Sequence, residues 1–291
     1  MNNLNRFIER CIKSVLFFCA AISIFVVLLI TVFVCIEGFP IIKKYGLLNF
    51  ILGRKWYPLD GVFGIFPMII GSIYVTCGAL LFGVPLGVGC AIFLAEIAPQ
   101  KIAKILRPGI ELLAGIPSVV YGFYGLVVIV PLIKKYFGGS GFSVLAASVI
   151  LTVMILPTIV NISEDAIRAV PAEYKEGSLA LGATHWQTIK RVILPTARSG
   201  IMTAIVLGMG RAIGETMAVI LVTGNVAKIP GSFLDPVRTL TSNIAIEMPY
   251  SAGEHTQALF ATGIVLFVLI MFLNILSTFT RSPRKGGKLS G

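Results

Sequence analysis

The sequence predicts an all-α membrane protein, a bundle of six transmembrane helices with a helix-turn-helix loop on the cytoplasmic side. Hydrophobic residues make up 56% of the 291 residues and charged residues only 13%, whereas charged residues are about a quarter of a soluble domain. The chain also holds 30 glycines and 15 prolines, which packed membrane helices tolerate because their neighbours satisfy the freed backbone groups. A soluble globular fold is therefore excluded.

Six apolar stretches are long enough to cross a hydrocarbon core. The first is too long for the core of a signal peptide and is followed by no small-x-small cleavage site, so we expect a true span. The stretches predict a transmembrane domain over residues 15–280, between an N-terminal segment, 1–14, and a basic tail, 281–291. They are Val15–Ile36, Val62–Ile97, Ile110–Ile133, Phe142–Ile162, Gly200–Val222 and Ala258–Phe279.

The second stretch, Val62–Ile97, could cross the membrane once or twice. As one helix it would be about 54 Å long, nearly twice the thickness of the core. With a cytoplasmic N-terminus and a single crossing, the inside segments hold roughly twice as many Lys and Arg residues as the outside segments, and a double crossing reverses this ratio. We therefore expect one crossing, both termini in the cytoplasm, and a stretch that is tilted, kinked near Pro85 or partly laid along the outer surface.

Several function classes find no support in the residues. The net charge of +11 does not indicate nucleic acid in a chain this apolar, where basic residues report topology. The five cysteines lie in or beside apolar stretches without CxxC spacing, so we expect neither disulfides nor a metal site. No G-x-x-x-x-G-K-[ST] loop is present, since Gly286-Gly-Lys288 is followed by Leu289. We expect no catalytic residues and no cofactor in this chain.

The loop 163–199 is the longest inside segment and is predicted to form two short helices. The first, Ala172–Leu181, follows Pro171, which suits a first turn, and stops at Gly182. The second opens at Thr184, with Gln187 in capping-box spacing, and is expected to end before Pro195. A structured loop at the membrane surface indicates a partner, although a basic loop resting on anionic lipid remains the alternative.

The same loop resembles the EAA loop of ABC importer permeases. That family's pattern is E-A-A, three residues, G, nine residues and I-x-L-P. Glu176, Gly182, Leu194 and Pro195 match it, while Gly177, Ser178 and Val192 replace the pattern's Ala, Ala and Ile. The resemblance implies that the loop docks on a separate ATPase subunit, which binds ATP and Mg.

One span carries opposite charges deep in its sequence, in Gly210-Arg211-Ala-Ile-Gly214-Glu215-Thr216. Arg211 and Glu215 are four residues apart, so we expect them to share one helix face. Charge within a membrane normally faces a bundle interior or a water-filled cavity and marks a pathway. Arginine presents a planar donor fork that matches tetrahedral oxyanions. The alternative is a salt bridge that only fixes helix packing.

Two strings resemble the permeases of the phosphate-specific ABC importer, of the PstC type. They are Gly208-Met-Gly-Arg211-Ala-Ile-Gly-Glu215-Thr216-Met-Ala and Leu106-Arg-Pro-Gly-Ile-Glu111-Leu-Leu-Ala-Gly-Ile-Pro117-Ser-Val-Val-Tyr121-Gly. The resemblance implies a bacterial inner or plasma membrane permease for inorganic phosphate. It also implies a heterodimer with a PstA-type permease, a PstB-type ATPase dimer and an extracytoplasmic phosphate-binding protein.

The resemblance places Arg211 and Glu215 in the translocation path. Beside them we expect Thr216, and the hydroxyls of Ser118 and Tyr121, which could meet a passing anion. Near the start of the third span, Arg107 and Glu111 have the spacing of an interfacial ion pair. A permease for another oxyanion such as sulfate or molybdate, an ion-gradient secondary transporter and a membrane anchor remain alternatives.

Overall fold

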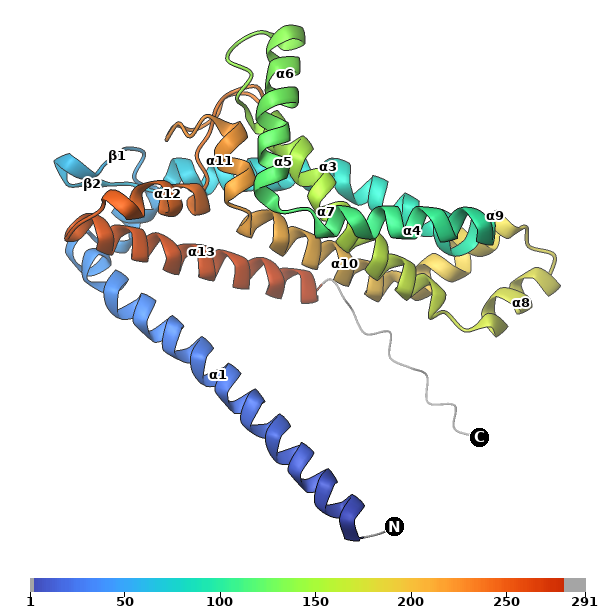
Figure 1. The fold of residues 1–291 in the computed structure, drawn as a ribbon. Helices are drawn as coiled ribbons and strands as arrows, with labels where there is room; N and C mark the ends of the chain where they lie inside the picture. Colours follow the sequence, from blue (N-terminus) through green and yellow to red (C-terminus); the bar gives the residue numbers. More distant parts are fainter. Residues whose placement is uncertain (1–2, 280–291) are drawn as a thin grey trace.

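The structure is a computed structural model that describes residues 3–279, so the expected basic tail, 281–291, lies outside the described residues. The described part is helical, apart from a short β-hairpin and connecting loops (Figure 1). Six of its helices are long and apolar enough to cross a membrane, as the sequence predicts. They cover Cys11–Tyr45, Phe66–Ile97, Ser118–Phe137, Val144–Arg168, His185–Gly214 and Glu254–Ile275.

The first half of the chain contains two spans, an outer hairpin and a broken third span. The helices are α1 (Asn3–Tyr45), α2 (Leu47–Leu52), α3 (Phe66–Ile92), α4 (Gln100–Gly115), α5 (Ser118–Tyr124) and α6 (Val130–Phe137). Strands β1 (Trp56–Tyr57) and β2 (Val62–Phe63) pair antiparallel around a short 3-10 turn, Pro58–Asp60. Two π-helical segments, η2 (Phe93–Ile97) and η3 (Gly125–Ile129), continue α3 and α5.

The second half contains the cytoplasmic loop and the remaining spans. Its helices are α7 (Val144–Arg168), α8 (Ala172–Ala180), α9 (His185–Thr188), α10 (Leu194–Gly214), α11 (Met217–Thr223), α12 (Leu240–Glu247) and α13 (Glu254–Phe279). A third π-helical segment, η4 (Ile189–Ile193), joins α9 to α10, and a 3-10 turn, Met248–Tyr250, follows α12.

The long second stretch forms a single helical span, as the charge distribution predicts. It runs without a break from Phe66 to Ile97, and its first residues, Val62 and Phe63, belong to the outer hairpin. Pro85 lies inside α3 without ending it. The excess length therefore divides between one long helix and a strand on the outer surface.

The third span begins later than expected. The predicted range Ile110–Ile133 is wrong at its start, because α4 ends at Gly115 and Ile116 is extended, with φ −73° and ψ 127°. Pro117 follows, and a residue before proline is driven out of the helical region by contact with the proline ring. The chain changes direction sharply between α4 and α5 (Figure 1).

The fifth span is also displaced from its expected range, Gly200–Val222. One continuous helical run begins at His185 and ends at Gly214. The second helix of the cytoplasmic loop therefore does not end before Pro195, as the sequence suggested. Pro195 sits at the start of α10, directly after the π-helical segment Ile189–Ile193.

Each π-helical segment ends two residues before a proline. The pairs are η2 with Pro99, η3 with Pro131 and η4 with Pro195. Proline cannot donate a hydrogen bond to the preceding turn, and its ring collides with the carbonyl four residues earlier. A wider turn of the backbone relieves that collision, and such turns occur mostly as single insertions in α-helices. This explains how the helix passes Pro131 and Pro195.

The centre of the bundle is built from α3, α7 and α10, which meet through glycines. Ile159 of α7 fills the space between Gly87 of α3 and Gly208 of α10, where a Cβ atom would lie 2.7 Å and 2.9 Å from its side chain. Gly83 faces Ile155 in the same way. Helices that lack a side chain at the contact approach closely, which strengthens packing in a bilayer.

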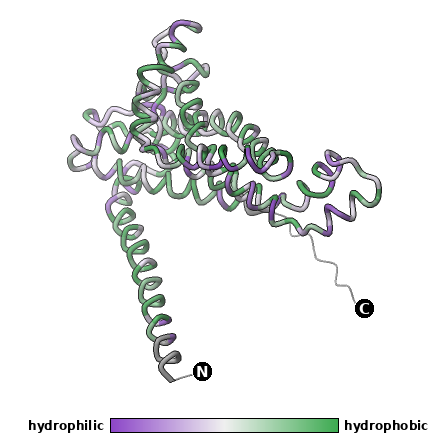
Figure 2. The backbone as a smooth tube through the Cα atoms, turned by 45° about the vertical axis from the view of Figure 1, so that its right-hand side comes forward, coloured by the Kyte–Doolittle hydropathy of each residue, from purple (hydrophilic) through white to green (hydrophobic). Residues whose placement is uncertain are grey.

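Helix α1 stands apart from this centre. Its outer end packs against α13, where Gly38 lies against the backbone of Ala261 and Lys44 pairs with Glu254. Towards the N-terminus it diverges from the bundle (Figure 1), and no residue in its most apolar stretch is buried. Figure 2 shows that this diverging part is hydrophobic along its length. Its surface is therefore suited to lipid or to another membrane helix.

Candidate functional site

The guanidinium of Arg211 lies near the middle of the bundle. Arg211 is in the last turn of α10, and its Nη1 atom is 3.5 Å from the Oγ1 atom of Thr158 in α7. At 1.5 Å per residue, Thr158 is about 15 Å from the cytoplasmic end of α7, at Arg168. Half of a hydrocarbon core has about this depth. The structure thus places the predicted charge near the middle of the length of α7.

Most of the hydrogen-bonding capacity of Arg211 is unused. A guanidinium carries five N–H donors, and within residues 3–279 its side chain has only the long contact with Thr158. The residue is half-buried. Because an unpaired charge is costly within a membrane, a group outside this chain's described residues must satisfy it: water in a cavity, a second subunit or an anion.

Glu215 does not share a helix face with Arg211, so that prediction is wrong. Helix α10 ends at Gly214, and Glu215 is extended, with φ −69° and ψ 132°. Its Oε1 atom accepts a hydrogen bond from the backbone N–H of Ala218 at 3.2 Å, which caps α11. Within the described range no ion pair joins the two charges.

Thr216 completes the break between α10 and α11. Its hydroxyl donates to the backbone carbonyl of Gly214 at 3.2 Å, and the carbonyl of Glu215 accepts from Thr241 Oγ1 at 3.0 Å. These bonds satisfy two carbonyls that the end of a helix leaves free. The fifth membrane segment is therefore interrupted beside Arg211 and is held in that shape by Thr216 and by Thr241 of α12.

A second break lies across from the first. Helix α5 contacts α11 where Gly122 meets Ala218, since a Cβ atom on Gly122 would be 2.7 Å from the Ala218 Cα atom. Ser118 is the first residue of α5 and is half-buried. Tyr121 is 7% exposed, and its hydroxyl donates to the carbonyl of Leu113 at 2.7 Å. Tyr121 therefore stabilises the turn between α4 and α5, and its hydroxyl proton is already used in the bond to Leu113.

The cytoplasmic hairpin, residues 172–188, has the predicted form. Gly182 has a φ of +84°, a conformation that side chains disfavour and that a helix stop commonly needs. The Thr184 hydroxyl accepts from the N–H of Gln187, whose side chain accepts from the N–H of Thr184, so the capping box is present. The hydroxyls of Ser178 and Thr188 lie 3.0 Å apart and join the two helices.

The hairpin, which is predicted to lie on the cytoplasmic side, has an apolar surface. Four large side chains on it are exposed by at least two fifths: Tyr174, Leu179, Leu181 and Trp186. Glu176 is also exposed on α8, whereas Leu194 is half-buried and Pro195 is exposed at the start of α10. The four residues that match the EAA pattern lie in two parts of the structure. Glu176 and Gly182 lie in the hairpin, and Leu194 and Pro195 lie at the root of the fifth span.

Two carboxylates near the hairpin, one buried and one largely buried, were not predicted from the sequence. Glu164 of α7 accepts from Arg107 of α4 and from Arg168, at N···O distances of 2.6 Å and 2.8 Å. Arg107 thus pairs with Glu164, and the expected pair with Glu111 is wrong. Glu96 of η2 accepts from Lys175 of α8 at 2.6 Å. Their position in the sequence could have identified them, since each carboxylate lies at the end of an apolar stretch that is predicted to face the cytoplasm.

On the outer side, the Glu247 carboxylate holds three segments together. Its oxygens lie 2.5 Å from Arg238 Nη1, 2.8 Å from His255 Nε2 and 2.7 Å from Trp56 Nε1. These partners come from the loop before α12, from α13 and from β1. The outer hairpin is thereby fixed to α12, whose Thr241 bonds the carbonyl of Glu215.

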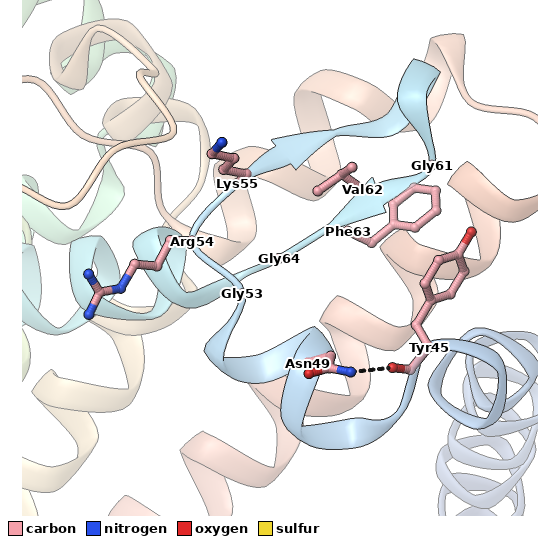
Figure 3. Close-up of a pocket in the computed structure, with 9 residues that line it drawn as sticks. All are labelled: Tyr45, Asn49, Gly53, Arg54, Lys55, Gly61, Val62, Phe63 and Gly64. Carbon is pink, nitrogen blue, oxygen red and sulfur yellow. Dashed lines mark hydrogen bonds between the residues drawn. The ribbon is translucent and has the colours of Figure 1, made fainter.

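A cavity of about 480 Å³ lies beside the outer hairpin. Figure 3 shows Tyr45 and Phe63 on one side of it, with the Asn49 amide donating to the carbonyl of Tyr45, while Arg54 and Lys55 point away from them. The two basic side chains do not converge. We therefore place the candidate anion site at the paired breaks beside Arg211 rather than here.

A six-span helical bundle with a charged interruption at mid-depth and an ordered cytoplasmic hairpin defines a membrane transport subunit of the permease class. The profile of the family described as "Binding-protein-dependent transport system inner membrane component" matches residues 83–281. The chain belongs to that family and is a multi-pass inner-membrane permease subunit of an ABC transporter. Such permeases work with an ATPase and a substrate-binding protein.

Individual proteins agree with this assignment. The chain is 43% identical to a probable ABC transporter permease, YqgH, of Bacillus subtilis, over 92% of this chain and 89% of that one. It is 34% identical to the phosphate transport system permease PstC of Haemophilus influenzae, over 92% of each. A bacterial alginate ABC transporter, solved with its alginate-bound periplasmic protein, contains a chain of the same fold, with a TM-score of 0.64, 19% identity and coverage of 97% and 99%.

Proposed function

We propose that this permease imports inorganic phosphate, and that phosphate passes the two breaks beside Arg211. The observation that carries the proposal is the guanidinium at mid-depth, whose donors are almost all unused within residues 3–279. A guanidinium presents parallel N–H donors that match two oxygens of a tetrahedral oxyanion. Relatives named as phosphate permeases, at 34% and 36% identity, support the choice of phosphate.

Glu215 supplies a basis for selecting phosphate over sulfate. Its Oε1 atom is bonded to α11, which leaves a second carboxylate oxygen as an acceptor. Phosphate at neutral pH retains a proton that this oxygen can accept, whereas fully ionised sulfate has no proton to donate. Thr216 and Ser118 border the same breaks and offer hydroxyls, while Tyr121 acts by holding the α4–α5 turn. The role of Glu215 is tested by the competition with sulfate in the experiment below.

The proposed complex contains four kinds of component. A PstA-type permease forms a heterodimer with this chain, and a PstB-type ATPase dimer binds ATP and Mg beneath it. An extracytoplasmic phosphate-binding protein delivers the anion to the outer loops. Both chain termini then lie in the cytoplasm, on the same side as the hairpin. This arrangement is supported by the excess of Lys and Arg in the segments on that side.

The hairpin is the proposed coupling element. Its exposed apolar side chains, Leu181 and Trp186 among them, suit a groove on the ATPase, since contiguous exposed apolar surface marks interaction sites. A capped and rigid helix pair follows the closing of an ATPase dimer better than a flexible loop does. Glu176, Gly182, Leu194 and Pro195 are the residues assigned to this role.

The experiment is uptake of radiolabelled phosphate by cells that depend on this chain, with and without excess sulfate. Arg211→Gln removes both the charge and the donor fork and should lower uptake by roughly 100-fold, by analogy with enzymes, in which the loss of one oxyanion-hole donor lowers the rate by about 10²–10³. Arg211→Lys keeps the charge without the planar fork and should retain part of the activity. The matched control is Arg54→Gln, which removes an exposed arginine beside the outer hairpin, away from the breaks.

Three results would contradict parts of the proposal. Normal uptake by Arg211→Gln, at equal protein levels, would remove Arg211 from the path. Inhibition of phosphate uptake by excess sulfate would show that the transporter accepts more than one kind of oxyanion. Co-purification without any ATPase or second permease would favour a secondary transporter that runs alone.

A further inference from the structure

We propose that Glu96 is a positioning residue that joins the cytoplasmic hairpin to the second span, so that the two move as one body. The inference rests on the proposed coupling role of the hairpin. It assigns a role to a residue outside the EAA pattern and outside the charged break.

Glu96 reaches both helices of the hairpin with a single carboxylate oxygen. Its Oε2 atom lies 2.6 Å from Nζ of Lys175 in α8 and 3.7 Å from Nε2 of His185 in α9. The Glu96 side chain is only 9% exposed, while those of Lys175 and His185 are 37% and 48% exposed. The carboxylate is therefore fixed in the bundle, and the side chains of Lys175 and His185 reach towards it from the hairpin.

Helix α8 has few other attachments to the membrane bundle. No residue of Ala172–Ala180 is buried. Among residues 3–279, its side chains make two hydrogen bonds, from Lys175 to Glu96 and between Ser178 and Thr188. The second bond stays within the hairpin. The charge-assisted bond to Glu96 is thus the side-chain link through which α8 holds the bundle, and such bonds are about twice as strong as neutral ones.

The link leads directly to the charged break. Glu96 lies in η2, which is continuous with α3. Helix α3 packs against Ile155 and Ile159 of α7 through Gly83 and Gly87, and Thr158, between those two residues, contacts Arg211. Closely packed interiors transmit displacement because they compress little. Movement of the hairpin therefore reaches the site through α3 and α7 as well as through the α9–α10 helix.

The test measures phosphate uptake per ATP hydrolysed by the whole complex in proteoliposomes. Glu96→Gln keeps the shape without the charge, and Glu96→Ala removes both. Each variant should assemble and hydrolyse ATP at the native rate, but the uptake per ATP should fall about tenfold, within the usual range for coupling between two sites. The exchanged pair Glu96→Lys with Lys175→Glu should recover most of the loss.

The matched control is Glu9→Gln. Glu9 pairs with Lys13 at 2.6 Å, the same distance, but the pair is exposed on α1, far along the chain from the hairpin. This variant should take up as much phosphate per ATP hydrolysed as the native complex does. Three results would each overturn the inference. They are a native uptake per ATP in both Glu96 variants, loss of assembly in both, and an exchanged pair whose uptake per ATP stays as low as in the single variants.

A second readout does not depend on the substrate. Spin labels at exposed Leu179 of α8 and Leu86 of α3, in a chain whose five cysteines are replaced by alanine, report the distance between hairpin and span. In the otherwise native complex the distance should be the same with and without trapped nucleotide, and Glu96→Ala should make it change between the two states. A distance that never changes would overturn the inference, whereas a native complex that imports no phosphate would overturn only the proposed substrate.

Discussion

Charged side chains find partners within the chain at the cytoplasmic end of the bundle, but not in its middle. Glu164 is bonded by two arginines, and Glu96 by Lys175. Arg211 has one contact, at 3.5 Å, within residues 3–279. Paired charges hold helices in place, whereas a charge that lacks partners in its own subunit remains available for a ligand. The difference separates residues that stabilise this permease from those proposed to act on its substrate.

The largest effect on stability should come from Glu164→Ala. The change leaves Arg107 and Arg168, whose side chains are 38% and 47% exposed, without their shared carboxylate. Each hydrogen bond to a charged group is worth about 1.5–3 kcal/mol, so losing both should be the largest of the effects considered. Denaturation of the purified permease in detergent should show this loss. Arg211→Met is the comparison, and it should change the stability by less than about 1 kcal/mol while abolishing uptake. Equal losses of stability in the two variants would contradict the distinction between charges that stabilise the permease and charges that act on its substrate.

Gly87→Val should have the next largest effect, because it tests packing in the middle of the bundle. A Cβ atom there would lie 2.7 Å from the side chain of Ile159, and overpacking typically costs about 1–3 kcal/mol. We expect lower thermal stability and a displaced Thr158, hence reduced uptake. Gly89→Val is the matched control, since no atom lies within 4 Å of the corresponding position. Similar melting temperatures for the two variants would show that α3 and α7 are not closely packed.

Gly182→Val should act on coupling more than on stability. The φ of +84° would strain a β-branched residue by about 1–2 kcal/mol, and nothing lies within 4 Å to obstruct the side chain itself. The helices of the hairpin should lose their relative orientation, so that ATP hydrolysis continues while uptake falls. Gly177→Val, in the helical part of the hairpin, is the control. Native uptake by Gly182→Val would exclude the turn from coupling.

The smallest effect is expected for Thr158→Val. Its hydroxyl is 3.5 Å from Arg211, at the limit of a hydrogen bond, so its removal should change stability by less than about 0.5 kcal/mol. Phosphate uptake should fall about twofold at most, because the donors of Arg211 remain available. A loss as large as that of Arg211→Gln would mean that Thr158 itself positions the guanidinium or contacts the anion.

Much of the architecture follows from local sequence. Apolar stretches longer than a hydrocarbon core identified six spans because no other arrangement satisfies so much apolar surface and backbone in a bilayer. The capping box at Thr184 and the stop at Gly182 were also predictable, since both depend on neighbours within four residues. The motif residues around Arg211 identified the charged segment, although their roles remain predictions.

Only the tertiary structure decided where helices break and which charges meet. Glu215 has helical spacing from Arg211, yet the chain leaves the helix there because Thr241 of α12 and the start of α11 satisfy the freed groups. Arg107 has helical spacing from Glu111, yet it pairs with Glu164, 57 residues away in the chain. Spacing within a helix is a local property, whereas the partner of a buried charge is whichever opposite charge the packed helices bring near.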